Sequence, residues 1–80
     1  MYMTSLNRRY NLNEFNFHGS INDSGAVYVL ELLINCSINE FEVPKETITI
    51  YDNEKSYTFE NFELNEWYEE NGCVKVVYVK

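Results

Sequence analysis

The sequence predicts an all-β protein, a small antiparallel sheet of five or six strands that is strongly bent or barrel-like. Two observations predict this class. Several stretches alternate apolar and polar side chains with period two, which is the pattern of strands that bury one face. Clusters of Asn, Asp, Ser and Gly separate these stretches, and Ala, the strongest helix former, occurs once in the chain. Aromatic residues make up 16% of the chain, and a strongly bent sheet or small barrel would cover them best.

We expect the 80 residues to form a single domain, with residues 1–11 as an irregular arm or a first strand. The apolar fraction of 45% is enough for one compact core, which argues against intrinsic disorder. No linker, repeat or low-complexity block divides the chain. A chain this short buries about 60% of the surface that its unfolded form exposes, so we expect a small margin of stability.

The strongest strand signal lies in the first half of the chain. Residues 12–21 alternate, with Phe15 and Phe17 on one face. In residues 26–38 every even position is apolar, so this segment is predicted to be a long strand with one face in the core. The cluster NDSG between the two segments, with Gly25 available for positive φ, predicts that they form a hairpin.

A bend is predicted after this hairpin. Phe41 and Val43 stand on odd positions, so the apolar phase slips by one residue. Such a slip indicates a bulge or bend near Asn39. Pro44 lacks a backbone donor and should end a strand or lie at an edge.

A second hairpin and a last strand are predicted in the second half of the chain. The stretches ETITIYD and SYTFE stand on either side of the turn DNEK, and Tyr57 and Phe59 share a face. At the end, CVKVVYVK is rich in β-branched residues, which predicts a strand that closes or edges the sheet.

Two structures compete for the acidic segment before the last strand. In the first, Asn65 caps one short helix near residues 65–71, which Gly72 ends in left-handed geometry. In the second, Asn71 and Gly72 form a two-residue type I′ turn, and a strand over residues 62–70 pairs with the last strand. A helix this short has little stability of its own, and Asn-Gly before a β-branched run is a strong hairpin signal, so the hairpin is favoured.

The hairpin alternative predicts a definite register and divides the carboxylates between two faces. It places three pairs of residues opposite each other: Trp67 with Val76, Tyr68 with Lys75, and Leu64 with Val79.

The net charge is −7, with six basic residues in the chain. Nucleic acids and anionic membranes are bound by clustered Lys and Arg, so the charge argues against both as direct partners. The N-terminus lacks the apolar stretch of a signal peptide, and no run of the sequence approaches the length of a membrane span. Two cysteines are too few for the disulfide framework of a small secreted domain. We therefore expect a cytoplasmic location.

The sequence predicts no catalytic residues, no metal site and no cofactor, so we expect that the protein is not an enzyme. It contains one histidine, His18, and two cysteines, Cys36 and Cys73, with no third group to orient them. This set does not make a zinc spacing, and no EF-hand or glycine-rich phosphate loop is present. Glu31 stands within a mostly apolar run, where a solvent-facing position is the ordinary interpretation.

Acidic and aromatic side chains are concentrated in one segment near the end of the chain. No Lys or Arg lies between Lys55 and Lys75. Trp and Tyr within a polar rim are typical anchors of protein interfaces, and a field of one sign speeds encounter with an oppositely charged partner. The ordinary alternative is that Trp67 is buried and the glutamates only keep the domain soluble. The candidate partner-binding residues are Glu60, Glu63, Glu66, Trp67, Tyr68, Glu69 and Glu70.

The leading functional hypothesis is a small acidic protein-binding module, an inhibitor or modulator that occupies a basic site on a partner protein. A nucleic-acid-handling enzyme would be such a partner, with carboxylates standing where phosphates would lie, as in a nucleic-acid mimic. An anti-defence protein of a phage or other mobile element would fit the size and charge. One alternative is a structural or assembly module that self-associates, for example as a homodimer, through the edge of its last strand. A second alternative is a small-ligand-binding β-barrel with Glu31 or His18 as its polar group.

Overall fold

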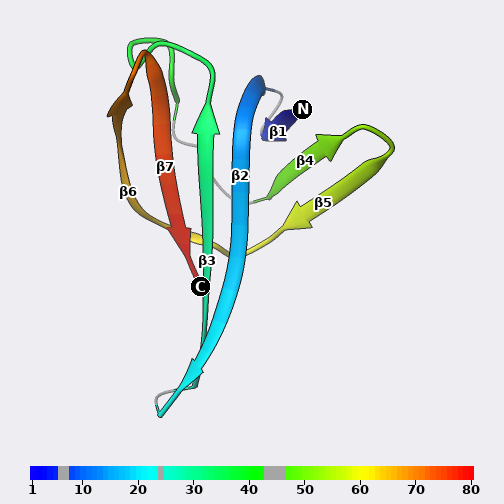
Figure 1. The fold of residues 1–80 in the computed structure, drawn as a ribbon, viewed down its shortest axis with the longest axis vertical. Helices are drawn as coiled ribbons and strands as arrows, with labels where there is room; N and C mark the ends of the chain where they lie inside the picture. Colours follow the sequence, from blue (N-terminus) through cyan, green and yellow to red (C-terminus); the bar gives the residue numbers. More distant parts are fainter. Residues whose placement is uncertain (6–7, 24, 43–46) are drawn as a thin grey trace.

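The computed structural model confirms the all-β class, because its described residues form a single seven-stranded antiparallel sheet and no helix (Figure 1). The structure describes residues 1–5, 8–23, 25–42 and 47–80. The strands are β1 (Tyr2–Ser5), β2 (Arg8–Asn22), β3 (Gly25–Ile34), β4 (Ile48–Asp52), β5 (Lys55–Phe59), β6 (Glu63–Glu70) and β7 (Cys73–Val79).

Across the sheet the strands lie in the order β5-β4-β1-β2-β3-β7-β6. Strands that follow one another in the sequence pair as β1–β2, β2–β3, β4–β5 and β6–β7. The link from β5 to β6 therefore runs from one edge of the sheet to the other. The last strand, β7, lies between β3 and β6, so the prediction that it closes or edges the sheet is wrong.

Three further details of the predicted fold are wrong. The described residues form a sheet of seven strands rather than five or six, because residues 2–5, which were predicted as part of an irregular arm or a first strand, form β1. It is an open sheet without strong curling, so the predicted strong bend or barrel is absent. A barrel would need its two edge strands to pair, whereas β5 and β6 lie at opposite edges. The short helix near residues 65–71 is absent as well, because β6 continues to Glu70 and the chain then turns.

The hairpin alternative for this segment is confirmed. Asn71 and Gly72 have φ of 51° and 79°, and positive φ at both residues is the mark of a type I′ turn. Two predicted pairs are present: Trp67 with Val76, and Tyr68 with Lys75. Leu64 pairs with Tyr78 rather than Val79, because the register shifts at Asn65. This irregularity keeps Leu64 on the same face as Trp67.

The hairpin of β2 and β3 is also confirmed, and it projects beyond the other strands (Figure 1). Its last pairs, from Gly19 with Tyr28 to the turn, have no other strand of the sheet beside them among the described residues. Gly25 adopts φ of 115° in the turn, as its predicted role requires.

The segment after β3 differs from its prediction. The strand expected over residues 26–38 ends at Ile34, where the chain leaves the sheet. The backbone N–H of Glu40 donates to the carbonyl oxygen of Ser37 at 3.0 Å, so the bulge or bend predicted near Asn39 takes the form of a turn. The predictions for Val43 and Pro44 lie outside the described residues.

The two faces of the sheet differ in burial. We call the face that bears Leu30, Leu32 and Ile34 of β3 the inner face, and the opposite face the outer face. These three side chains are fully buried, and Phe41 covers the inner face from the segment after β3. The core consists of Met3, Tyr10, Leu12, Leu30, Leu32, Ile34, Phe41, Ile48, Ile50, Phe59, Val74, Val76 and Tyr78.

No part of the described chain forms a helix that is long and apolar enough to cross a membrane.

Candidate functional site

Strand β6 forms one edge of the sheet and pairs with β7 alone. All eight of its residues are exposed. One side of its backbone therefore has no strand beside it among the described residues. Such an edge offers N–H and C=O groups to another chain, and charged side chains are a common protection against indiscriminate pairing.

The candidate residues on β6 divide between the two faces, as the hairpin alternative predicts. Directly opposed residues of antiparallel strands share a face. Trp67 lies opposite Val76 and Glu69 opposite Val74, which places both on the inner face. The remaining members on β6 lie on the outer face, and they are Glu63, Glu66, Tyr68 and Glu70.

Trp67 is an exposed aromatic side chain that is held from one side. Its exposed fraction is 40%, and its ring centroid lies 5.2 Å from that of Phe41. Phe41 in turn contacts the ring of Tyr10 at 6.0 Å. Trp67 is therefore not a core residue. The alternative, in which the glutamates only keep the domain soluble, requires a buried Trp67.

The carboxylates of β6 have no ion-pair partner among the described residues. The ion pair of the described chain lies elsewhere and joins Arg8 to Glu42 at 2.8 Å, and the imidazole of His18 lies 3.8 Å from the carboxylate of Glu31. No described cation therefore lies within ion-pair distance of these carboxylates. A basic partner would meet this charge directly.

Glu60 does not belong to this strand, although the sequence places it in the same acidic segment. It lies in the link between β5 and β6. Its carbonyl oxygen accepts a hydrogen bond of 3.1 Å from Nζ of Lys80. The structure therefore brings together the six candidate residues of β6 and places the seventh at a different surface.

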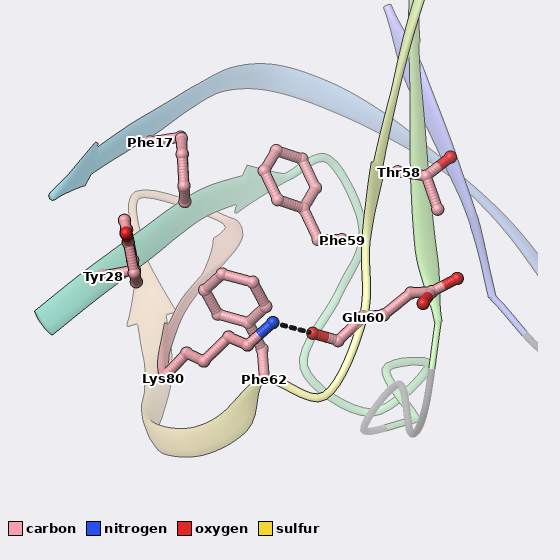
Figure 2. Close-up of a pocket in the computed structure, with 7 residues that line it drawn as sticks. All are labelled: Phe17, Tyr28, Thr58, Phe59, Glu60, Phe62 and Lys80. Atoms are coloured by element: carbon pink, nitrogen blue, oxygen red, sulfur yellow. Dashed lines mark hydrogen bonds between the residues drawn. The ribbon is translucent and has the colours of Figure 1, made fainter. Parts of the chain in front are cut away.

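That surface is a hollow on the inner face, between the projecting β2–β3 hairpin and the link from β5 to β6 (Figure 2). We call it the aromatic pocket, and it has a volume of about 390 Å³. A second hollow of about 430 Å³ adjoins it and shares Phe17, Thr58 and Phe59. The lining residues are Phe17, Tyr28, Thr58, Phe59, Glu60, Phe62 and Lys80.

This pocket was not predicted from the sequence, although the aromatic residues in the two hairpins are part of the evidence for it. Phe15 and Phe17 share a face in one hairpin, and Tyr57 and Phe59 share a face in the other. Each pair is typical of core residues when its hairpin is considered alone. The link from β5 to β6 brings Phe62 to the same place, and no local pattern indicates this.

Phe17 is the centre of the ring cluster. Its centroid lies 5.1 Å from that of Phe59 and 6.1 Å from that of Phe62. The ring of Tyr28 stands 6.0 Å away and is inclined by only 8° to that of Phe17. Tilted, edge-on and offset-stacked arrangements are the favourable ones for aromatic pairs.

The histidine and the cysteines singled out in the sequence have different neighbours in the described structure. His18 lies near Glu31 on the outer face, whereas Asn13 donates a hydrogen bond to Sγ of Cys73 at 3.2 Å. Burial raises the pKa of the Cys36 thiol, with further contributions from Glu40 and Cys73, so the reactive thiolate is disfavoured. In the described part of the chain, no three His, Cys, Asp or Glu side chains are grouped to hold a metal ion.

The described chain thus presents two candidate surfaces, the acidic edge strand β6 and the aromatic pocket. They adjoin at Phe62, which lines the pocket and directly precedes β6. Comparison with known proteins identifies no matching family model, curated protein or solved structure.

Proposed function

We propose that the protein is a small acidic protein-binding module, an inhibitor or modulator that uses β6 to occupy a basic site on a partner protein. The observation that supports this function is the placement of β6. It is an edge strand, every one of its residues is exposed, and it carries glutamates on both faces together with Trp67. Carboxylates on both faces would meet a basic groove from either side.

Trp67 is suited to be the anchor of this interface. Tryptophan is enriched among the residues that contribute most to protein binding. Its contact with Phe41 already restricts the ring. A side chain that is ordered before binding loses less conformational entropy on binding, so the contact favours affinity.

The partner we propose is a protein with a basic surface, such as an enzyme that handles nucleic acids. Such enzymes gather Lys and Arg to bind phosphates. The carboxylates of β6 would stand where phosphates lie, and the chain would compete with the substrate. A protein from a phage or other mobile element that blocks a host defence enzyme fits this chemistry. We propose that binding takes place in the cytoplasm and involves no catalysis by this chain.

Affinity capture from a lysate of the source cells tests the proposal. The chain should retain a partner at low salt and release it at about 1 M salt, where the Debye length falls to about 3 Å. The variant E63Q/E66Q/E69Q should retain much less partner at low salt, because it removes three charges from β6. Band intensities of the captured protein give the comparison.

A variant with the same change in charge is the control. Glu14, Asp23 and Glu54 are exposed and lie outside β6. E14Q/D23N/E54Q should therefore retain the partner almost as well as the wild type. Capture that is indifferent to salt, or that both triple variants reduce equally, would rule out β6 as the electrostatic contact.

Self-association is a second candidate, and the charges of the edge strands favour β5 for it. Two β6 strands would oppose like charges, which destabilises cross-strand pairing. The other edge strand, β5, carries Lys55 and no carboxylate. We expect a dimer that pairs through β5 to be visible by size-exclusion chromatography with light scattering. A monomer at micromolar concentration would contradict it.

A further inference from the structure

We propose that the aromatic pocket binds a small aromatic carboxylate or a similar planar, apolar anion. This site is distinct from β6 and does not depend on the function proposed for that strand. Its features are exposed rings, a volume suited to a small molecule and the ammonium group of Lys80 at the rim (Figure 2).

The rings of the pocket are incompletely covered in the isolated chain. Phe17 has an exposed fraction of 47% and Tyr28 one of 41%. Exposed apolar surface that is gathered in a hollow is typical of binding sites. A flat apolar ligand set against Phe17 and Tyr28 would remove this surface from water, which is favourable by about 25 cal/mol per Å².

The size of the pocket fits a small molecule. Ligand sites usually have volumes of about 300–1,000 Å³ and are lined mainly by apolar side chains with a few polar groups. The pocket measures about 390 Å³, and the adjoining hollow, lined by Phe15 and Tyr57 among others, extends it. A molecule of one or two rings would occupy the space.

Lys80 selects the charge of the ligand. Among the described residues that line the two hollows, it carries the only positive charge. An ammonium group has three donors, and the carbonyl oxygen of Glu60 uses one of them at 3.1 Å. Nζ also lies 5.5 Å from the ring centroid of Phe62, so a bound carboxylate could reach it from the ring cluster. Figure 2 shows the carboxylate of Glu60 pointing away from these rings.

Two backbone hydrogen bonds join Tyr28, which carries the stacking ring, to Lys80, which carries the cation. The N–H of Lys80 donates to the carbonyl oxygen of Tyr28 at 3.0 Å, and the N–H of Tyr28 donates to the carbonyl oxygen of Lys80 at 3.2 Å. This reciprocal pair fixes the residue that carries the ring beside the residue that carries the charge. Such preorganisation lowers the entropic cost of binding a ligand that uses both.

Two fluorescent dyes test the proposal. 1-Anilinonaphthalene-8-sulfonate is an apolar aromatic anion, and N-phenyl-1-naphthylamine is its uncharged analogue. We expect the anion to bind saturably with one site per chain, and Lys80→Gln to weaken its affinity about tenfold, because a hydrogen bond to a charged group is lost. The affinity of the uncharged dye should change little in the same variant.

Further variants locate the site. Phe17→Ala should weaken both dyes, because it removes the central ring. Lys75→Gln removes a lysine that pairs with Tyr68 on the outer face, so it should leave both affinities unchanged. Circular dichroism verifies folding, and the comparison of Lys80→Gln with Lys75→Gln decides the question even where Phe17→Ala unfolds the chain.

Three results would overturn the proposal. The first is the absence of saturable binding of the anionic dye. The second is an equal loss of affinity in Lys80→Gln and Lys75→Gln, which would indicate a general charge effect. The third is an uncharged dye that binds as tightly as the anion, which would indicate a purely apolar occupant such as a side chain of a partner protein.

Discussion

The ring of Tyr28 lies against Gly19, its partner on the neighbouring strand, so closely that a Cβ at position 19 would stand 2.8 Å from Cδ1 of the ring. Real Cβ atoms essentially never come this near another heavy atom. The Tyr28 ring can occupy this position because Gly19 has no side chain. Because Tyr28 stacks beside Phe17, this glycine also shapes the aromatic pocket.

We expect Gly19→Ala to displace the Tyr28 ring and to weaken binding of the anionic dye several-fold. The free energy of unfolding should change by no more than about 1 kcal/mol, because alanine also restricts the unfolded chain. Ser20→Ala is the control, since Ser20 is exposed and pairs with Val27 on the outer face. Dye titration and urea denaturation measure the two effects. An unchanged dye affinity in Gly19→Ala would show that the position of the Tyr28 ring does not matter for binding.

The assignment of inner and outer faces predicts a large difference between two adjacent leucines. Leu32 is fully buried, whereas Leu33 is half-buried on the outer face. Leu32→Ala should lower the free energy of unfolding by about 2–5 kcal/mol, because it leaves a cavity in the core. Leu33→Ala should cost clearly less. Urea denaturation of both variants measures this, and equal losses would contradict the assignment of the faces.

Alkaline pH should destabilise the fold through Tyr78. Burial raises the pKa of the Tyr78 hydroxyl, and the nearby Tyr10 adds to the rise. The folded pKa therefore lies above the unfolded value of about 10. The stability that depends on the neutral phenol is fully present below about pH 10 and is lost as the pH rises through the folded pKa.

Denaturation at a series of alkaline pH values measures this effect. We expect Tyr78→Phe to flatten the loss of stability above about pH 10, because phenylalanine has no proton to release. Tyr68→Phe is the control, since Tyr68 is exposed. If Tyr68→Phe flattened the curve as much as Tyr78→Phe, the effect would belong to exposed tyrosines in general and not to the buried one.

Local pattern was sufficient to predict much of the secondary structure. Period-two alternation identified the strands on either side of Gly25, and Asn71-Gly72 predicted the turn and the pairing of Trp67 with Val76. These features are short-range, because a turn and the residues beside it determine the register of a hairpin. The exposure of Trp67 is consistent with this register but needed the structure, since it depends on what covers the inner face.

The errors of the prediction concern pairings between distant segments. The period-two alternation after Gly25 did not indicate that β3 would lie between β2 and β7, and the β-branched run of β7 was expected at an edge. The entropic cost of closing a loop grows only slowly with its length, so sequence distance alone does not select which strands become neighbours.

The residue pattern was sufficient to predict β-hairpins, and it favoured a strand with carboxylates on both faces over a short helix for the acidic segment. It did not predict that this strand is an edge, that the sheet stays open, or that Phe17, Phe62 and Lys80 meet in one pocket. The link from β5 to β6 accounts for this difference. It joins the two edges of the sheet and carries Phe62 to residues that lie far from it in the sequence, and such long-range packing leaves no periodic signal in the chain.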